Sequence, residues 1–180
     1  MIPRLFAVYL GGRAPRATIE LHDMVFVAGD SIEDCYAQIL DKWFGTPGRV
    51  HIDSVLELDI VDGWKIELVK APSAHKEKLF FVNLGAYNSI DFTELHAANF
   101  HVAAEESQAK AAALATHFTG GVTEPHKDDL LEVDDCLAID GAGGWHVKLT
   151  RTNAVSMQKP SNQYHAIPKP VIAAWLAAKK

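Results

Sequence analysis

One segment of the sequence occurs twice, 74 residues apart, and this repeat constrains the fold more than any other feature. Residues 5–22 align without a gap with residues 79–96, and eight of the eighteen positions are identical. Unrelated segments of average composition would share roughly one position. The chain is therefore expected to fold as two diverged copies of one unit.

Each copy has the pattern of a β-β-α-β-β unit. Alternating apolar residues favour strands, and apolar residues at helical spacing favour a helix. In the first copy we expect strands at 4–10, 20–28, 54–61 and 64–70 and a helix at 32–44. Asp30 is expected to cap this helix with Glu33 as its partner, and Asp62-Gly63 is a strong hairpin signal. The second copy predicts a helix over 104–118 and a wider turn at 141–144.

These patterns predict an α+β fold with three segments. Residues 1–75 form the first unit, residues 76–151 form the second unit, and residues 152–180 form a basic linker followed by a short helix from Pro170. The two units are expected to be related by a pseudo-twofold axis, with an antiparallel or mixed sheet and both helices on one face. Trp175 and Leu176 are expected to anchor the last helix on the body.

The charge distribution argues against nucleic-acid binding. The chain has 180 residues and a net charge of −6, and residues 152–180 alone carry four lysines and no acidic residue. An acidic body repels a phosphate backbone, so a small molecule or another protein is the expected partner, and a homo-oligomer is compatible with the sequence. No apolar run is long enough for a membrane span. The two unmatched cysteines, Cys35 and Cys136, suit a reducing cytoplasm, and Cys35 lies on the apolar stripe of the helix, where we expect a core residue.

Several short blocks of the first copy resemble one known family. The blocks are Leu5–Gly12, Ile19–Asp23, Trp43–Gly45 and His51–Ser54. They are similar to the bacterial domain-of-unknown-function family numbered 1543. The resemblance implies a unit of this size and a bacterial origin, and it implies no activity. The second copy departs from the pattern at four positions, where Asn83, Ala86, Ala97 and His117 stand in place of Tyr9, Gly12, Asp23 and Trp43.

A pair of Glu-x-His and His-x-Asp motifs is the sharpest candidate for a functional site, and both copies carry it. The residues are Glu20, His22, His51 and Asp53 in the first copy and Glu94, His96, His126 and Asp128 in the second. Residues i and i+2 of a strand point to the same face. Imidazole nitrogens and carboxylate oxygens are suitable ligands for zinc, manganese or iron, so a divalent metal is the cofactor that such a set would hold.

The same residues admit two other interpretations. A His-carboxylate pair can act as a general acid or base. Alternatively, these side chains satisfy backbone groups where a loop enters a strand, which is a common role for polar residues in turns.

A second candidate site is an anion cradle at the end of the first strand. Gly11 and Gly12 are followed by Arg13 and Arg16, and backbone N–H groups with two guanidinium groups can bind an anion. A turn that ends the strand is the alternative explanation of the same residues.

The sequence leads to two hypotheses about function. The first is a binding or interaction module whose cleft or loops recognise a small ligand or another protein, and it agrees with the lack of any known enzyme motif. The second is a metal-assisted hydrolase or related enzyme that uses the His and carboxylate ligands to hold an ion that activates water.

Overall fold

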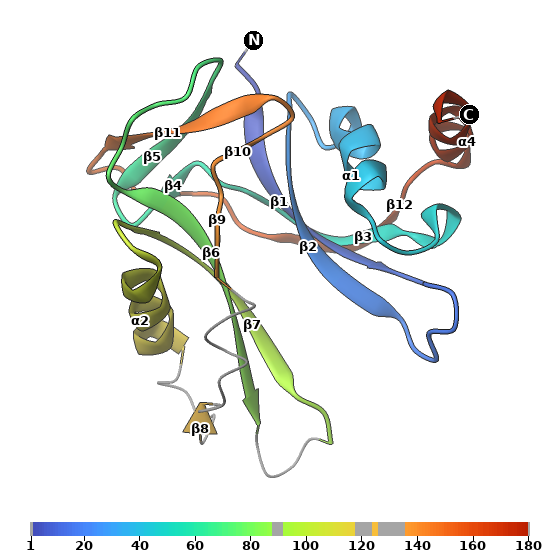
Figure 1. The fold of residues 1–180 in the computed structure, drawn as a ribbon, viewed down its shortest axis with the longest axis horizontal. Coiled ribbons are helices and arrows are strands. Elements are labelled where there is room, and N and C mark those ends of the chain that lie inside the picture. The colour runs from blue at the N-terminus through green and yellow to red at the C-terminus, as the bar shows by residue number, and fades with distance from the viewer. Residues whose placement is uncertain (1, 88–91, 118–123, 126–135, 180) are drawn as a thin grey trace.

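The computed structural model of the chain describes residues 2–87, 92–117, 124–125 and 136–179, and Figure 1 shows their arrangement. Within these residues the strands form three sheets, and every strand pairing is antiparallel. No helix among the described residues is long and apolar enough to cross a membrane.

The first sheet has the strand order β12-β3-β1-β2 and contains the N-terminal strand at an inner position. Its strands are β1 (Arg4–Gly12), β2 (Leu21–Gly29), β3 (His51–Glu57) and β12 (Ser161–Ala166). The middle sheet has the order β10-β11-β5-β4. Its strands are β4 (Ile60–Val61), β5 (Trp64–Val69), β10 (Gly141–Ala142) and β11 (Trp145–Arg151).

The third sheet has the order β7-β6-β8, and β9 also pairs with β6. Its strands are β6 (Lys78–Tyr87), β7 (Leu95–Ala103), β8 (Glu124–Pro125) and β9 (Cys136–Ala138). The helices are η1 (Glu33–Cys35), α1 (Tyr36–Lys42), η2 (Pro47–Arg49), α2 (Glu106–His117) and α4 (Lys169–Ala178).

Strand β1 separates two hydrophobic clusters because its side chains alternate between the two faces of the first sheet. Phe6, Val8 and Leu10 pack against α1 in one cluster. Leu5 and Ala7 point to the other face and join a central cluster with the middle and third sheets. A third cluster lies between β6 and α2. The central cluster therefore holds residues from both halves of the chain.

The two helices α1 and α2 lie on separate sheets. Helix α1 packs on β2 of the first sheet, and α2 packs on β6 and β7 of the third sheet. Figure 1 shows them on opposite outer sides of the molecule. The expected α+β class is confirmed, but the expected single sheet layer with both helices on one face is replaced by three sheets around the central cluster.

The cap of the first helical segment differs from the expected one by a single residue. Ser31 and Asp34 exchange hydrogen bonds, with the Ser31 N–H donating to Asp34 Oδ2 over 3.0 Å and the Asp34 N–H donating to Ser31 Oγ over 3.3 Å. This is the reciprocal geometry of a capping box. Asp30 and Glu33, the capping pair that the sequence predicted, occupy the positions just before Ser31 and Asp34.

The hairpin at Asp62-Gly63 forms as the sequence predicts. Both residues have positive φ, 49° at Asp62 and 73° at Gly63, as a tight two-residue hairpin turn requires. The turn also reaches the third sheet, because Asp62 Oδ2 accepts the backbone N–H of Val102 at 2.9 Å and lies 3.1 Å from Nδ1 of His101.

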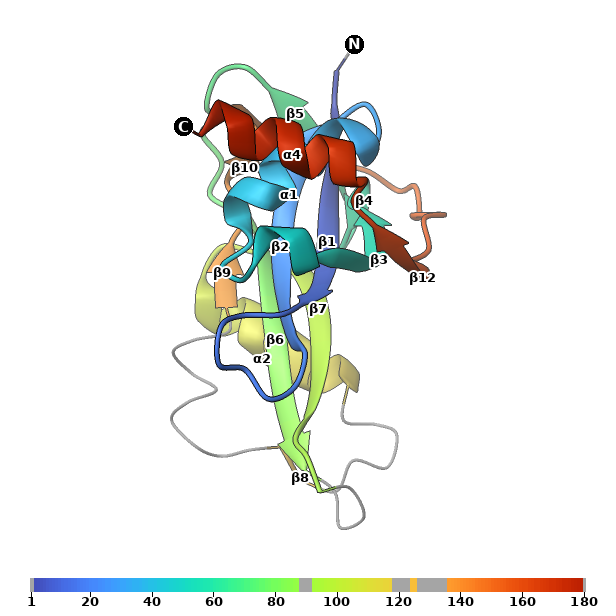
Figure 2. The same cartoon turned by 90° about the vertical axis from the view of Figure 1, so that its right-hand side faces the viewer.

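The segment at 152–169, which the sequence suggested is a linker, contains strand β12. Its residues pair with β3 at the edge of the first sheet, with Ser161 opposite Val55 and Ala166 opposite His51. Most side chains of this strand are exposed, so its residues are polar and lack the apolar alternation that predicts a strand. Helix α4 follows as expected and packs beside α1, where Figure 2 shows it across the top of the first sheet.

The anchors of α4 differ in part from the expected pair. Trp175 packs on the first cluster and its Nε1–H donates to Asp41 over 2.9 Å, but Leu176 is half-exposed. The buried anchor is Ile172, which was not among the anchor residues predicted from the sequence.

Candidate functional site

Gly11 is at the centre of the candidate site. It pairs with His22 on β2 and with His51 on β3, so the three residues form one row across three strands. Residues that pair across antiparallel strands project from the same face. Because Gly11 has no side chain, the space above it is available to side chains of the neighbouring strands.

The side chain of Asp53 fills this space together with the ring of His51. A Cβ atom placed on Gly11 would lie 2.5 Å from Asp53 Oδ2 and 2.5 Å from His51 Nε2. Contacts that short do not occur between real atoms of this kind, so only glycine permits this arrangement. The β1–β3 register also shifts between Tyr9 and Leu10, next to the row.

Four of the predicted residues form a chain of contacts in the first half of the protein. His51 Nε2 lies 3.1 Å from Glu20 Oε1 and 3.2 Å from Asp53 Oδ1. His22 Nε2 lies 3.5 Å from Asp53 Oδ2. We call Glu20, His22, His51 and Asp53 the tetrad. A single Nε2–H of His51 has two carboxylates within reach, so the two acceptors compete for it.

The tetrad is open to solvent on one side. The side chain of His51 is 11 % exposed, whereas those of His22 and Glu20 are 42 % and 41 % exposed. Asp53 Oδ2 is buried, and among the described residues nothing donates a hydrogen bond to it. The groups that a ligand can reach are therefore the half-exposed Glu20 carboxylate and His22 imidazole, both of which can accept a hydrogen bond.

Two tyrosines flank the tetrad. The ring of Tyr9 stacks on His22 with a centroid distance of 5.2 Å and an interplanar angle of 1°. The ring of Tyr164 lies 4.5 Å from that of His51. Burial raises the pKa of the Tyr9 hydroxyl above its ordinary value, and the nearby charge of Asp53 raises it further. Tyr9 therefore stays protonated and can donate a hydrogen bond at neutral pH.

Tyr164 belongs to β12, and no sequence pattern pointed to it, because the polar composition of the surrounding segment predicted a linker. Tyr9 did carry a signal, since Asn83 stands in its place in the second half.

In the second half the structure describes part of the corresponding set. Gly85 pairs with His96, as Gly11 pairs with His22, and the carboxylate of Glu94 occupies the space above Gly85. His96 Nε2 lies 3.6 Å from Glu94 Oε2. His126 and Asp128 lie outside the described residues.

The metal-ligand arrangement is not found in the part of the chain that the structure describes. There, no group of three or more His, Cys, Asp and Glu side chains has the geometry to hold a metal ion. In the tetrad the imidazole nitrogens and carboxylate oxygens contact each other directly, at 3.1 to 3.5 Å.

The four residues of the predicted anion cradle each have a separate structural role. Gly11 and Gly12 belong to β1 and pair with β2, so they are extended strand residues. A Cβ on Gly12 would lie 2.7 Å from both the Trp43 ring and the backbone oxygen of Arg49. The Arg13 guanidinium donates to the backbone oxygen of Thr18, and Arg16 has a positive φ of 69° in the loop.

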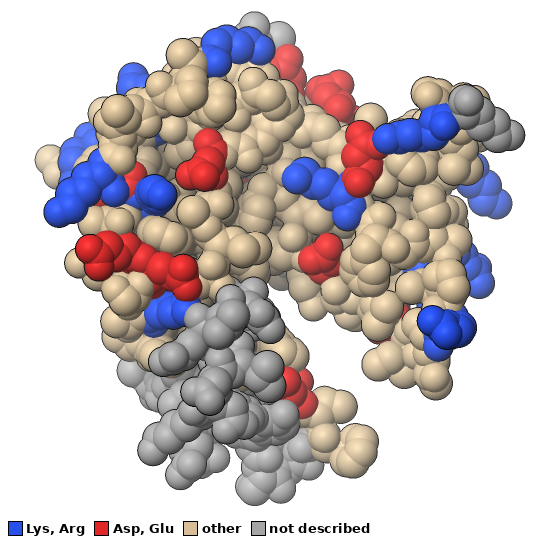
Figure 3. Space-filling view, viewed as in Figure 1, with Lys and Arg blue, Asp and Glu red and all other residues tan. Residues whose placement is uncertain are grey.

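The tetrad faces the space between two diverging hairpins. Tyr9 and Gly11 follow Leu5 and Ala7 on the same face of β1, the face that carries the central cluster. Figure 1 shows the β1–β2 and β6–β7 hairpins spreading apart below this cluster, and Figure 3 shows a notch between them at the surface. We call the β1–β2 hairpin arm one and the β6–β7 hairpin arm two.

Comparison with known proteins identifies similar sequences and a similar structure. The family model described as Domain of Unknown Function (DUF1543) matches residues 17–68. The crystal structure of a protein Il1583 from Idiomarina loihiensis is 34% identical, covers 93% of this chain and 99% of that chain, and superposes with a TM-score of 0.72. No curated protein matches the sequence.

Proposed function

The chain belongs to the DUF1543 family, and we propose that it is a binding module whose ligand contacts the tetrad on the inner face of arm one. The observation that carries this proposal is the convergence of Glu20, His22, His51 and Asp53 around Gly11. His22 belongs to β2 with Glu20 just before it, and His51 and Asp53 belong to β3. Side chains from two strands that meet above a glycine of the strand between them form a preorganised polar site on a rigid element.

The charge of the tetrad indicates the kind of ligand. With neutral imidazoles the four side chains carry two negative charges, and the Glu20 carboxylate is exposed enough to accept hydrogen bonds from a ligand. A ligand with several N–H or O–H donors, or with a cationic nitrogen, matches both features. The rings of Tyr9 and Tyr164 provide apolar faces beside the carboxylates. We therefore propose a small polar ligand rich in donors, such as an amine or a polyol.

A metal-assisted hydrolase is the second candidate. Its support is the donor set: contacts of 3.1 to 3.5 Å link two imidazoles and two carboxylates, which are ligand types for zinc, manganese or iron. These side chains contact each other directly, so they would have to separate to admit an ion. In this case Asp53 and the two histidines would hold the ion, and the ion would activate a water molecule.

Melting-temperature shifts test the binding module. A collection of amines, amino acids and sugars is screened with the wild-type protein, with Asp53→Asn and with the control His75→Ala, whose side chain is exposed and bonded to Ser73 away from the tetrad. A compound that stabilises the wild type and the control by several degrees, and Asp53→Asn much less, supports the proposal. Equal stabilisation of all three proteins contradicts it.

Metal content separates the two candidates. Protein purified without a histidine tag is analysed by elemental mass spectrometry, together with His22→Ala. Near-stoichiometric zinc, manganese or iron that is lost in His22→Ala favours the hydrolase. Protein without metal, and with a melting temperature unchanged by added metal, favours the binding module.

We further propose that the chain consists of two diverged copies, residues 1–75 and 76–151, followed by residues 152–180. The strand registers support this. Leu5 pairs with Ala28 in β1–β2, and Leu79 pairs with Val102 in β6–β7. Both residues of the second pair lie 74 positions after their counterparts in the first pair, which is the offset of the sequence repeat. The β5–β11 pairing supports a pseudo-twofold axis. Residues 64–68 align in sequence with residues 145–149 of the other copy, so Lys148 is the counterpart of Glu67, and the two lie directly opposite each other.

We also propose that the protein is bacterial and that it functions in the cytoplasm. The relative from Idiomarina loihiensis supports the first part. The two cysteines support the second, since both are buried free thiols.

A further inference from the structure

A groove of about 420 Å³ lies on the face of the first sheet opposite the tetrad. It runs between the start of β1, the segment that leads into η1, and strand β12. Its volume is within the range typical of small-molecule sites. The residues that line it are Arg4, Phe6, Ser31, Ile32, Glu33, Ile52, Val55, Ser161, Gln163 and His165.

The floor of the groove is apolar. Phe6 and Ile52 belong to the cluster under α1, and Ile32 and Val55 pack on the edge of that cluster while partly exposed. Phe6 and Ile52 are already nearly buried, so a ligand with an apolar body is stabilised here mainly by covering the partly exposed Ile32 and Val55.

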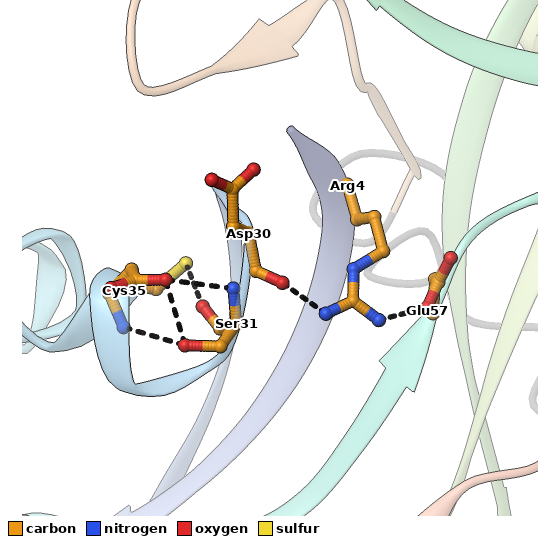
Figure 4. A network of polar contacts seen from close by, with 6 residues as sticks. Arg4, Asp30, Ser31, Cys35 and Glu57 are labelled. Carbon is orange, nitrogen blue, oxygen red and sulfur yellow. Dashed lines mark hydrogen bonds and ion pairs between the residues drawn. The ribbon is translucent and has the colours of Figure 1, made fainter. Parts of the chain in front are cut away.

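Arg4 is held in place at one end of the groove. Figure 4 shows its guanidinium between the backbone oxygen of Asp30 and the carboxylate of Glu57. The distance from Arg4 Nη1 to Glu57 Oε2 is 3.0 Å, and the guanidinium carbon lies 5.2 Å from the centre of the Phe6 ring. A guanidinium has five N–H groups, more than these two acceptors use. Arg4 is therefore a preorganised donor toward an acceptor in the groove.

Strand β12 supplies the opposite wall. Ser161, Gln163 and His165 alternate along the strand and point to the groove, whereas Tyr164 points to His51 on the other face. His165 Nε2 lies 2.5 Å from the hydroxyl oxygen of Tyr36, which fixes the end of this wall. The groove thus exists because the C-terminal segment pairs with β3.

The charges around the groove select an uncharged ligand. Glu57 neutralises Arg4, and Glu33 at the rim repels an anion. Ser161 and Gln163 both donate and accept hydrogen bonds, which suits a neutral amide or carbonyl group.

We propose that this groove is a second binding site, for an uncharged amphipathic small molecule. Its carbonyl-type oxygen accepts from Arg4, and its flat apolar part lies over Phe6, Ile52 and Val55. This site is independent of the tetrad, since the two lie on opposite faces of the first sheet.

Benzamide is a suitable probe because it combines a flat ring with a neutral amide, and benzoate is the matched anion. Binding is measured by amide chemical shifts on the full-length protein. We expect saturable shifts that cluster at the groove residues, and an affinity for benzoate that is at least several-fold lower. Shifts that cluster elsewhere, or a failure to saturate up to the solubility limit, overturn the proposal.

Two variants that fill the groove complete the test. Val55→Trp places a large ring over the floor, and Ser161→Trp does so from the exposed rim, where folding is less at risk. Each is expected to weaken benzamide binding at least tenfold. The control Val155→Phe adds bulk at an exposed position outside the groove and should leave the affinity unchanged. Unchanged affinity in a folded Ser161→Trp protein overturns the proposal.

Discussion

At the scale of single residues, the tetrad depends on an absent side chain. His22 and His51 flank Gly11 in one row, and any Cβ at that position would enter the space that Asp53 and His51 occupy. The glycine thus determines that a carboxylate can lie between two imidazoles on the surface of a sheet. Gly85 has the same relation to Glu94 and His96.

Gly11→Ala is therefore expected to destabilise the protein and to disrupt the tetrad. Forcing an atom into a filled site costs about 1–3 kcal/mol, which urea denaturation measures. Gly48→Ala is the matched control, because nothing lies within 4 Å of a Cβ there. The interpretation fails if both variants are as stable as the wild type.

The thiol of Cys35 gives a prediction about pH. Burial, together with the nearby charges of Asp34 and Glu33, raises its pKa from 9.0 to about 11. The folded state thus keeps the proton that the unfolded state loses, so this contribution to stability is full below pH 9 and is lost as the pH rises toward 11. We expect Cys35→Ala to show a smaller fall in unfolding free energy between pH 9 and pH 11 than the wild type. A parallel fall in both proteins would show that the thiol has no such role.

Sequence reasoning identified the four tetrad residues but not their meeting point. The i, i+2 spacing of Glu20 with His22 and of His51 with Asp53 predicted that each pair shares a face, because that follows from strand geometry alone. Their convergence depends on β2 and β3 flanking β1 in a specific register, which is a long-range property. Tyr164 was missed for the same reason, as it joins the site only through pairing of β12 with β3.

At the scale of elements, the local signals were the dependable ones. The Asp62-Gly63 turn forms as expected, because it depends on residues close together in sequence. The apolar stripe expected over residues 32–44 is buried as far as Trp43, but α1 ends at Lys42 and Phe44 is exposed. The strand order was not predictable, because β5 pairs with β11 about 80 residues later. Strand β12 lacks an apolar face of its own and is stabilised by the edge it covers.

The hairpin turn also connects the two halves of the chain. Asp62 accepts the N–H of Val102 at the edge of β7 and contacts His101, whose ring is largely buried. Without the carboxylate, both partners lose an acceptor. A buried group left without its partner costs about 1–3 kcal/mol.

Asp62→Gly tests this connection while it preserves the positive φ that the turn requires. We expect a loss of about 1–3 kcal/mol in unfolding free energy. Asp62→Asn keeps a side-chain oxygen for the Val102 N–H and should lose less. If Asp62→Asn and Asp62→Gly are equally stable, the carboxylate contact does not hold the turn to β7.

At the scale of the whole molecule, the middle sheet joins the two proposed copies. Its two long strands are β5 from the first half and β11 from the second, and they pair around Glu67 and Lys148. The central cluster beneath contains Leu5, Leu68 and Leu79, which come from both halves. Neither half can bury this surface alone, so the two are expected to unfold together.

The two buried cysteines report on this coupling because they lie in different outer clusters. Cys35 is in the cluster under α1 and Cys136 is in the cluster under α2. Burial raises the pKa of both thiols, so each reacts with a thiol reagent mainly when its surroundings open.

Leu68→Ala removes a buried side chain from the central cluster and touches neither cysteine cluster. The substitution is expected to cost about 2–4 kcal/mol, which corresponds to roughly a 30-fold or larger increase in the open population. If the halves open together, the labelling rates of Cys35 and Cys136 rise by the same factor. The control Leu176→Ala changes a half-exposed residue and should leave both rates nearly unchanged. A rise at one cysteine alone would mean that the copies unfold as separate domains, and that the middle sheet joins two units that are stable on their own.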